Sequence, residues 1–343
     1  MDINKLLNNI ENSSVSAQKK SELIIYAKLL SSKELPVFFD DIHLRTSLNI
    51  PVDIKIDDFV RKETLSHFVR KRSGELRVIS SPNYNLKQMQ RWILTEVFSH
   101  QIVSQYAHGF IKNRSILTNA QSHIHQEESW VLNIDLRDFF SSITYEDVFK
   151  LFYKMGYNIE VSEIFAKLCT FENRLAQGFP TSPYIANLYL YQFDENMGDY
   201  IKNVDDSVVY TRYADDLVFS GVKKRGYTRF IAQLIQTVES ELELINLCIN
   251  TKKTRIQKKS VKRITGLNVS ANGVSISKSY VKTLKQTIYY CKKFGIIDHL
   301  KYHGKEDISN FKGYLYGQAY FIKMIDNTEG AFVLKELNGL DWI

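Results

Sequence analysis

The stretch that decides the fold is residues 208–221, which read V-V-Y-T-R-Y-A-D-D-L-V-F-S-G. Two runs rich in β-branched and aromatic residues flank Asp215 and Asp216, and this pattern predicts a tight β-hairpin with both carboxylates at its tip. Two adjacent negative charges are unfavourable unless something positive neutralises them, and Mg²⁺ does so with hard oxygen ligands. For this dipeptide alone, a solvated Asp-Asp turn is the alternative.

A second acidic strand lies upstream, in residues 131–143, which read V-L-N-I-D-L-R-D-F-F-S-S-I. The apolar run before Asp135 predicts a buried strand that delivers one carboxylate at its C-terminal end. If this strand neighbours the hairpin, the acids can share two metal ions roughly 3.5–4 Å apart, an arrangement that stabilises the attacking and leaving oxygens of a phosphoryl displacement. We expect Asp135 and Asp215 as bridging ligands, the Leu136 carbonyl as a backbone ligand and Asp216 as a third acid.

Composition sets outer bounds on the function. The chain has 343 residues, with 45 Lys plus Arg against 38 Asp plus Glu and a net charge of +7, which suits a polyanionic partner without requiring one. Three distant cysteines without a CxxC pair exclude a disulfide framework or a cysteine zinc site and indicate a cytoplasmic protein. The N-terminus, M-D-I-N-K-L-L-N-N-I, lacks a long apolar run, so we expect no signal peptide and no membrane partner.

Three motifs in order resemble those of reverse transcriptases. Tyr213-Ala214-Asp215-Asp216 resembles the YxDD signature, and Asp135 with Phe139-Phe140 resembles the strand of the first catalytic aspartate. Between them, residues 177–183, Q-G-F-P-T-S-P, resemble the QGxPxSP block. The resemblance covers about residues 70–266, and Phe179 departs from it because the family usually has Ala there.

Two shorter elements narrow the resemblance to retron reverse transcriptases. Asn119-Ala120 with His123 is similar to their NAxxH element, and Ile264-Thr265-Gly266 is similar to VTG, with Ile for Val. The resemblance implies an RNA-directed DNA polymerase that copies a structured non-coding RNA into short single-stranded DNA (msDNA). It also implies priming from a guanosine 2′-OH of that RNA and a role in anti-phage defence with an effector protein.

The resemblance further implies an α+β fold, the right-hand polymerase, with fingers, a palm built on a four-stranded antiparallel sheet with helices, and a helical thumb. We expect an N-terminal helical extension at residues 1–59, fingers at 60–110 and 143–178, palm at 111–142 and 179–274, and thumb at 275–343. Thr144 and Asp147 predict a capping box that opens a helix through about Met155. Ser182 is expected as the N-cap and Pro183 as the first residue of a long helix.

By resemblance, the nucleotide site draws on several segments. Its expected members are Arg70, Arg77, Asp138, Phe140, Gln177, Gly178 and Lys253, with Arg72 as a further candidate. Ser73-Gly74 predicts a turn between two short strands, so that Arg70, Arg72 and Arg77 lie on or beside a hairpin. Arginine suits triphosphate oxygens because it stays charged and binds them bidentately, although a solvated basic turn is the alternative. Asp138 and Lys253 can equally be solvated surface residues. Phe140 falls at the family's steric gate, where a ring excludes a ribose 2′-OH. The alternative is that Phe139 and Phe140 are both core residues, whereas strand alternation would place only one in the core.

Expected RNA contacts fall in three places. The basic stretch 252–263, the aromatic and basic helices after residue 275, and the NAxxH element supply them. The candidates are Asn119, His123, Lys252, Lys258, Lys259, Lys262, Arg263, Tyr289, Lys292 and Lys293. A solvated basic face, a small aromatic core and a hydrogen-bonded structural histidine are the respective alternatives.

The expected ligands follow from the same resemblance. They are two Mg²⁺ ions, with Mn²⁺ as an alternative, deoxynucleotides, a structured non-coding RNA that is template and primer, the nascent single-stranded DNA and an effector protein. Two other functions stay open. One is another bacterial reverse transcriptase of the abortive-infection, diversity-generating or group II intron-like type, and the other is an inactive RNA-binding scaffold.

Overall fold

The computed structural model describes residues 3–70, 74, 76–304 and 308–342. The chain divides into two compact units, each assembled from three stretches. The first unit comprises Met1–Phe110, Asp135–Asp199 and Gln233–Asn250, and the second comprises Ile111–Ile134, Tyr200–Ala232 and Thr251–Ile343. The division after Ile134 separates the expected catalytic Asp135 from the residues that precede it. The expected limits of fingers, palm and thumb therefore stay predictions.

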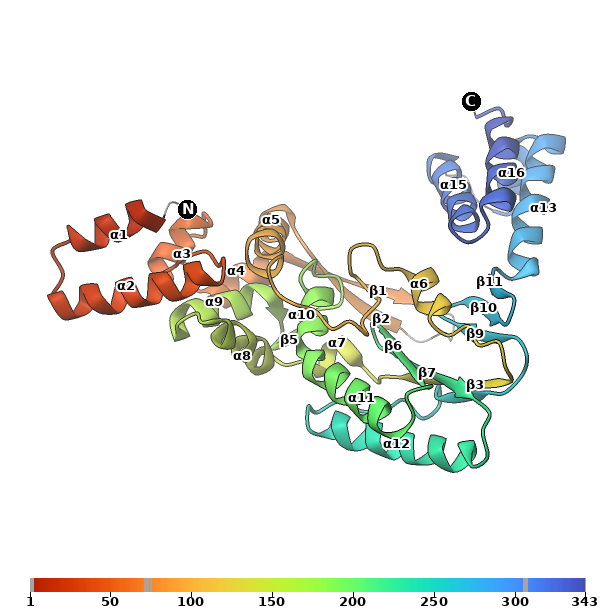
Figure 1. The fold of residues 1–343 in the computed structure, drawn as a ribbon. Helices are drawn as coiled ribbons and strands as arrows, with labels where there is room; N and C mark the ends of the chain where they lie inside the picture. The colour runs from red at the N-terminus through yellow and green to blue at the C-terminus, as the bar shows by residue number, and fades with distance from the viewer. Residues whose placement is uncertain (1–2, 71–73, 75, 305–307, 343) are drawn as a thin grey trace. The chain divides into compact units, whose positions relative to one another are not determined.

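The first unit is mainly helical (Figure 1). Its elements are α1 (Ile3–Glu11), α2 (Ala17–Ser32), α3 (Asp41–Ser47), α4 (Ile56–Lys62), β1 (Thr64–Arg70), β2 (Leu76–Pro82), α5 (Tyr84–Trp92), a π-helical turn (Ile93–Phe98), α7 (Phe139–Ser142), α8 (Tyr145–Met155), α9 (Ile159–Cys169), β4 (Thr170–Phe171), β5 (Arg174–Leu175) and α10 (Ser182–Tyr189). Helices α11 (Tyr191–Val204) and α12 (Tyr227–Glu243) contribute residues to both units.

Stacked aromatic rings form the core of the first unit. The Phe152 ring lies 5.4 Å from Phe98 and 5.0 Å from Phe165, centroid to centroid. Phe38, from the loop after α2, meets Phe165 edge-on at 6.0 Å. Each such ring buries about 150–250 Å² and prefers these offset or edge-on geometries. The loop after α2 is therefore packed onto α9 through an aromatic contact.

Strands β1 and β2 form an antiparallel hairpin whose register runs from Thr64↔Pro82 to Arg70↔Leu76. Most of its side chains are exposed, including the cross-strand pair Phe68 and Val78. The expected turn around Ser73 and the candidate Arg72 lie outside the described residues.

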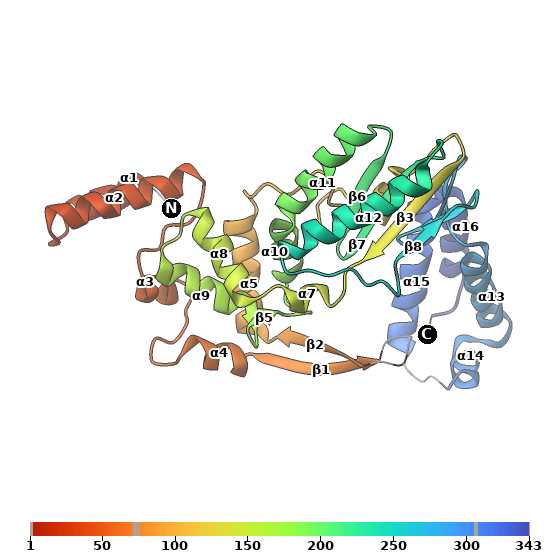
Figure 2. The ribbon, with the colours of Figure 1, turned by 90° about the horizontal axis from the view of Figure 1, so that it is seen from below.

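The second unit contains a four-stranded sheet in the order β6-β7-β3-β8 (Figure 2). Its strands are β6 (Val209–Tyr213), β7 (Asp216–Val222), β3 (Ser129–Asp135) and β8 (Arg255–Gln257). The β6–β7 hairpin predicted from the sequence is confirmed, with antiparallel register from Val209↔Ser220 to Tyr213↔Asp216. Strand β3 is buried up to Ile134, also as predicted.

A smaller sheet in the order β11-β10-β9 follows in the second unit. It consists of β9 (Lys262–Ile264), β10 (Leu267–Ser270) and β11 (Gly273–Ser275). Helix α6 (Ile116–Gln121) packs against β10 and β6 (Figure 1). Ala120 of α6 shares a buried cluster with Val218 of β7 and with Ile264, Leu267 and Val269. Helix α6 therefore lies between the catalytic hairpin candidate and the small sheet.

Four helices complete the second unit: α13 (Lys278–Phe294), α14 (Ile296–Tyr302), α15 (Ile308–Ile325) and α16 (Asn327–Asn338) (Figure 2). They enclose their own apolar cluster, which includes Leu284, Ile288, Leu315, Ile322 and Val333. The helical character expected for the C-terminal part is thus confirmed. Within the described ranges, none of the helices combines the length and apolar character needed to cross a bilayer.

The ends of α8 and α10 bear on three local predictions. The Thr144–Asp147 capping box is present at the start of α8, which ends at Met155. Helix α10 begins one residue earlier than predicted, with Thr181 as its N-cap, because the Ser182 hydroxyl donates to the Ala176 carbonyl (2.6 Å) instead of capping. The single long helix expected from there is wrong, since α10 ends at Tyr189 and α11 begins at Tyr191.

The loop that carries Gln177 and Gly178 rests on the backbone of β2. The Ser80 N–H donates to the Gln177 carbonyl (2.9 Å). Gly178 has φ +122°, and a Cβ placed there would stand 2.5 Å from the Ser80 carbonyl oxygen. Only glycine fits both the backbone conformation and this close approach.

We predict that Gly178→Ala lowers the free energy of unfolding by about 1–3 kcal/mol or more, because it adds both backbone strain and steric overlap. Urea denaturation of the purified protein measures the change. Gly317→Ala is the matched control: Gly317 lies within α15 and a Cβ there meets open space, so a gain of up to about 1 kcal/mol is expected. Equal stability of Gly178→Ala and the wild type would show that the loop does not rest on β2 as described.

Candidate active site

The two adjacent aspartates lie at the turn between β6 and β7. Tyr213 and Asp216 form the last cross-strand pair, so Ala214 and Asp215 make up the two-residue turn. Ala214 has φ +56°, a left-handed conformation that such a turn requires. Asp215 and Asp216 are both half-buried. The predicted placement of both carboxylates at the hairpin tip is therefore confirmed.

Arg212 stabilises this turn, a role that was not predicted from the sequence. Its side chain is fully buried, and Nη1 donates to the Ala214 carbonyl at 3.3 Å. Arg212 pairs with Leu217 and so points to the face opposite Asp216. This bond fixes the backbone of the turn that carries Asp215. The only hint in the sequence is a charged residue inside an otherwise apolar strand.

Asp135 ends β3, the strand next to β7 in the sheet. Asn250 holds it from two directions: its backbone N–H donates to the Asp135 carbonyl (2.7 Å) and its Nδ2 donates to Asp135 Oδ2 (2.9 Å). Leu136 is buried and forms a β-bridge with Ile249. Asn250 therefore fixes the orientation of the Asp135 carboxylate, a role that sequence reasoning did not assign to it.

The donor set fits a hard divalent cation. Three carboxylates and a backbone carbonyl are oxygen ligands of the kind that Mg²⁺ and Mn²⁺ prefer, whereas zinc sites favour His and Cys. In the described ranges, no three His, Cys, Asp or Glu side chains form a group that could hold a metal ion by themselves. The metal set of Asp135, Leu136, Asp215 and Asp216 and the number of ions therefore stay predictions.

Asp138 and Phe140 follow β3 in an unexpected conformation. Asp138 has φ +47°, and its carbonyl accepts hydrogen bonds from the Ser141 and Ser142 hydroxyls. The next residues form the short helix α7, so the strand alternation expected for Phe139 and Phe140 is wrong. As expected, only one of the two rings is in the core: Phe139 is 4% exposed, whereas Phe140 is half-buried. The gate role of Phe140 stays a prediction.

The remaining nucleotide-site candidates lie on the surface or in the loop described above. Arg70 pairs with Leu76 and Arg77 with Val69, so the two arginines extend from opposite faces of the β1–β2 hairpin. Gln177 is half-buried and Gly178 is exposed, while Phe179 is buried with its ring 6.4 Å from Phe171. Lys253 is exposed in the turn before β8.

The RNA-binding candidates separate into exposed and buried residues. Lys252, Lys258, Lys259 and Arg263 are exposed. Lys262 is only 6% exposed and donates to Ser129 Oγ at 2.6 Å. Burial, followed by the positive charge of Lys223, lowers the pKa of the Lys262 ammonium.

Asn119 and His123 are buried as well. His123 is hydrogen bonded to Thr211 and Ser220, which is the structural alternative raised for it. No described group is hydrogen bonded to the Asn119 side-chain amide. The RNA contacts expected for both residues stay predictions.

The C-terminal helices present the other RNA-binding candidates. Tyr289 is 55% exposed, and Lys293 Nζ lies 5.9 Å from the centre of its ring. Lys292 is exposed but engaged with Glu336 at 2.7 Å. Tyr290, beside them, stacks with Phe294. An exposed aromatic and basic surface is thus present, as the sequence predicted.

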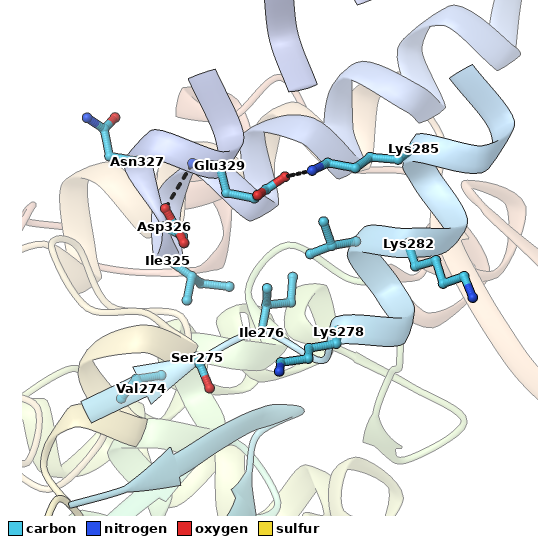
Figure 3. A pocket seen from close by; sticks show the side chains of 11 residues that line it. Val274, Ser275, Ile276, Lys278, Lys282, Lys285, Ile325, Asp326, Asn327 and Glu329 are labelled. Carbon is cyan, nitrogen blue, oxygen red and sulfur yellow. Dashed lines mark hydrogen bonds and ion pairs between the residues drawn. The ribbon is translucent and has the colours of Figure 1, made fainter. Parts of the chain in front are cut away.

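A pocket of about 730 Å³ lies between β11, α13 and the start of α16 (Figure 3). Lys278, Lys282 and Lys285 are spaced on one face of α13, and sequence reasoning did not single them out. Lys285 points to Glu329 and pairs with it at 2.6 Å. The i, i+4, i+7 spacing of the lysines in the sequence is the signal that could have found them.

Comparison with known proteins agrees with this arrangement. Residues 69–269 match the family described as reverse transcriptase (RNA-dependent DNA polymerase). The chain is 36% identical over 238 residues to the retron Ec86 reverse transcriptase of Escherichia coli, covering 68% of this chain and 72% of that protein. It is 33% identical over 318 residues to the retron Mx162 reverse transcriptase of Myxococcus xanthus, covering 81% of this chain and 62% of that protein.

Among solved structures, telomerase from Candida albicans with a fragment of telomeric RNA is similar at a TM-score of 0.46 and 12% identity. The alignment covers 94% of this chain and 61% of the telomerase chain. Its TM-score is too low to support a conclusion about this chain. The family match and the retron relatives carry the assignment. The chain belongs to the reverse transcriptases, which are RNA-directed DNA polymerases, and within them to the retron type.

Proposed function

We propose that the protein copies part of a structured non-coding RNA into short single-stranded DNA, the msDNA of a retron, and that this DNA serves anti-phage defence with an effector protein. The observation that supports the chemistry most is the sheet order, in which β7, beginning at Asp216, is the neighbour of β3, ending at Asp135. Thr265 of the ITG element donates to the carbonyl of Ile116 (3.2 Å), the first residue of the helix that carries Asn119 and Ala120 of NAxxH, which supports the retron assignment.

Reverse transcriptases use divalent metal ions, and in our proposal Asp135, Asp215, Asp216 and the Leu136 carbonyl hold two of them. When bound, such ions supply positive charge to the attacking and leaving oxygens of an in-line displacement. The chain's own part is to hold the carboxylates in position. The Asn250 side chain donates to Asp135 Oδ2, and buried Arg212 donates to the Ala214 carbonyl in the turn that carries Asp215.

The reaction joins a primer hydroxyl oxygen to the α-phosphorus of a deoxynucleotide and breaks the bond to pyrophosphate, which leaves. Arg77 and Lys253 are assigned to the triphosphate, whose charge they offset. Because Arg70 and Arg77 lie on opposite hairpin faces, Arg70 is assigned to a template or primer phosphate instead. Gln177 and Gly178 are assigned to the base pair being formed.

RNA binding is assigned to exposed cations and rings. Lys252, Lys258, Lys259 and Arg263 suit phosphates, and Tyr289 with Lys293 suits a stacked base. The cysteines Cys169, Cys248 and Cys291 are all free, as a reduced cytoplasmic protein requires. We therefore propose a cytoplasmic enzyme whose partners are the structured RNA, the nascent DNA, deoxynucleotides and an effector.

Co-purified nucleic acid tests the retron assignment. The gene is expressed with its flanking DNA, and nucleic acid bound to the purified protein is sequenced. We predict one discrete short DNA joined to RNA, and its loss in the Asp215→Asn/Asp216→Asn double variant, because asparagine keeps the size of each side chain and removes its charge.

Two other outcomes of this experiment would contradict the retron assignment. Heterogeneous DNA, equally lost in the double variant, would point to another bacterial reverse transcriptase. RNA without DNA in both samples would favour an RNA-binding scaffold over an enzyme.

Replacement of Phe140 tests the proposed steric gate. Phe140→Ala should raise ribonucleotide incorporation relative to deoxynucleotide incorporation by about tenfold or more, the ratio typical of one lost packing contact. Primer extension with each nucleotide type alone measures it. Phe140→Tyr keeps the ring and serves as the control that should retain selectivity. If Phe140→Ala selects sugars as the wild type does, Phe140 is not the gate.

A further inference from the structure

One imidazole joins the two strands of the catalytic hairpin candidate. His123 is 1% exposed, and its ring nitrogens make hydrogen bonds of 2.7 Å to hydroxyls on different strands. Nε2 is bonded to Thr211 Oγ1 on β6, and Nδ1 is bonded to Ser220 Oγ on β7. The ring therefore spans the hairpin from its β6 side to its β7 side.

These bonds form on the hairpin face that carries Asp216. Thr211 pairs with Val218 and Tyr213 pairs with Asp216, and alternate residues of a strand share a face. Thr211, Asp216 and Ser220 consequently point to the same side. A displacement of His123 would therefore act on the side of the hairpin to which the Asp216 carboxylate points.

The hydrogen bonds continue beyond His123. Ser220 Oγ also lies 2.7 Å from His125 Nε2. A neutral imidazole has one donor and one acceptor, and a hydroxyl donates one hydrogen bond. Each of the three hydrogen bonds that run from Thr211 through His123 and Ser220 to His125 thus has one donor and one acceptor when both rings are neutral. Their protons then all point the same way, either towards Thr211 or towards His125. Burial, followed by the charge of Lys262, lowers the pKa of His125, which favours the neutral ring.

Packing holds α6, the helix that ends two residues before His123, in place. Ala120, one turn earlier, is fully buried against Val218 of β7 and against β10. The first residue of α6, Ile116, accepts a hydrogen bond from Thr265 through its carbonyl oxygen. The NAxxH and ITG elements are therefore one assembly in space, attached on one side to the small sheet and on the other to the hairpin.

We propose that His123 is a positioning residue that fixes the catalytic hairpin through one hydrogen bond to each strand, so that its removal slows the chemical step without weakening substrate binding. The proposal rests on the proposed polymerase function and assigns the NAxxH histidine a partner within the protein. His123 acts through Thr211 and Ser220 and does not touch the substrate in this role.

Isosteric and conservative variants test it. Thr211→Val removes the hydroxyl and keeps the shape, whereas Thr211→Ser keeps the hydroxyl. We expect kcat for deoxynucleotide incorporation to fall about 10–100-fold in His123→Ala and in Thr211→Val, the loss typical of groups that orient a catalytic ligand. The KM for deoxynucleotide should stay unchanged, and Thr211→Ser should restore kcat. Thr237→Val, a helical threonine that bonds only within α12, is the control and should match the wild type.

A double-mutant cycle separates positioning from general destabilisation. The double variant His123→Ala/Thr211→Val should show no larger decrease in kcat, and no larger decrease in melting temperature, than the worse single variant, because both substitutions remove the same bond. Additive losses, or folded single variants with wild-type kcat, would overturn the proposal. A wild type that incorporates no deoxynucleotide on any template would overturn the proposed function instead. The melting-temperature cycle would then decide on the His123 bond alone.

Discussion

Two neighbouring carboxylates at a β-turn are the constraint around which this protein is organised. Like charges a few ångströms apart near a protein surface repel by about 4 kcal/mol, so the turn holds both only if surrounding groups compensate. The chain supplies a buried Arg212 bonded to the turn backbone and a hairpin anchored on one face by His123. Asn250 performs the corresponding task for Asp135 at the end of β3. The Arg212 and His123 side chains are buried, and Asn250 is also bonded to the Asp135 backbone, so each support is held in place. This suits a site whose ligands must be in position before substrate arrives.

The local pattern of the sequence predicts much of this fold. Alternation around residues 208–221 gives the hairpin, the apolar run before Asp135 gives a buried strand, and Thr144 with Asp147 gives a helix start. The pattern fails where one residue decides the conformation: a left-handed Asp138 turns an expected strand into α7, and a buried Ser182 hydroxyl moves a helix start.

The supports of the site were harder to predict, because they depend on contacts between distant residues. His123 is separated by 97 residues from Ser220, and Asn250 by 115 residues from Asp135. Nothing in the neighbourhood of either residue specifies its partner. Lys262 shows the converse: a lysine in a densely basic stretch suggested an RNA contact, yet its ammonium is turned inward to Ser129. Composition indicates how many cations a segment carries, and only the fold indicates which of them face solvent. The NAxxH and ITG elements, far apart in the chain, likewise meet only in the folded protein, at Ile116 and Thr265.

The central claim is that Asp135, Asp215 and Asp216 form one metal-dependent polymerase site. The most direct test is extension of a labelled primer on an RNA template by purified protein, with Mg²⁺ varied, for the wild type and for Asp135→Asn, Asp215→Asn and Asp216→Asn. We predict extension that requires Mg²⁺ in the wild type and is lost in Asp135→Asn and Asp215→Asn, with at least a large decrease in Asp216→Asn. Extension that persists without divalent ions, or that survives Asp135→Asn, would contradict the claim.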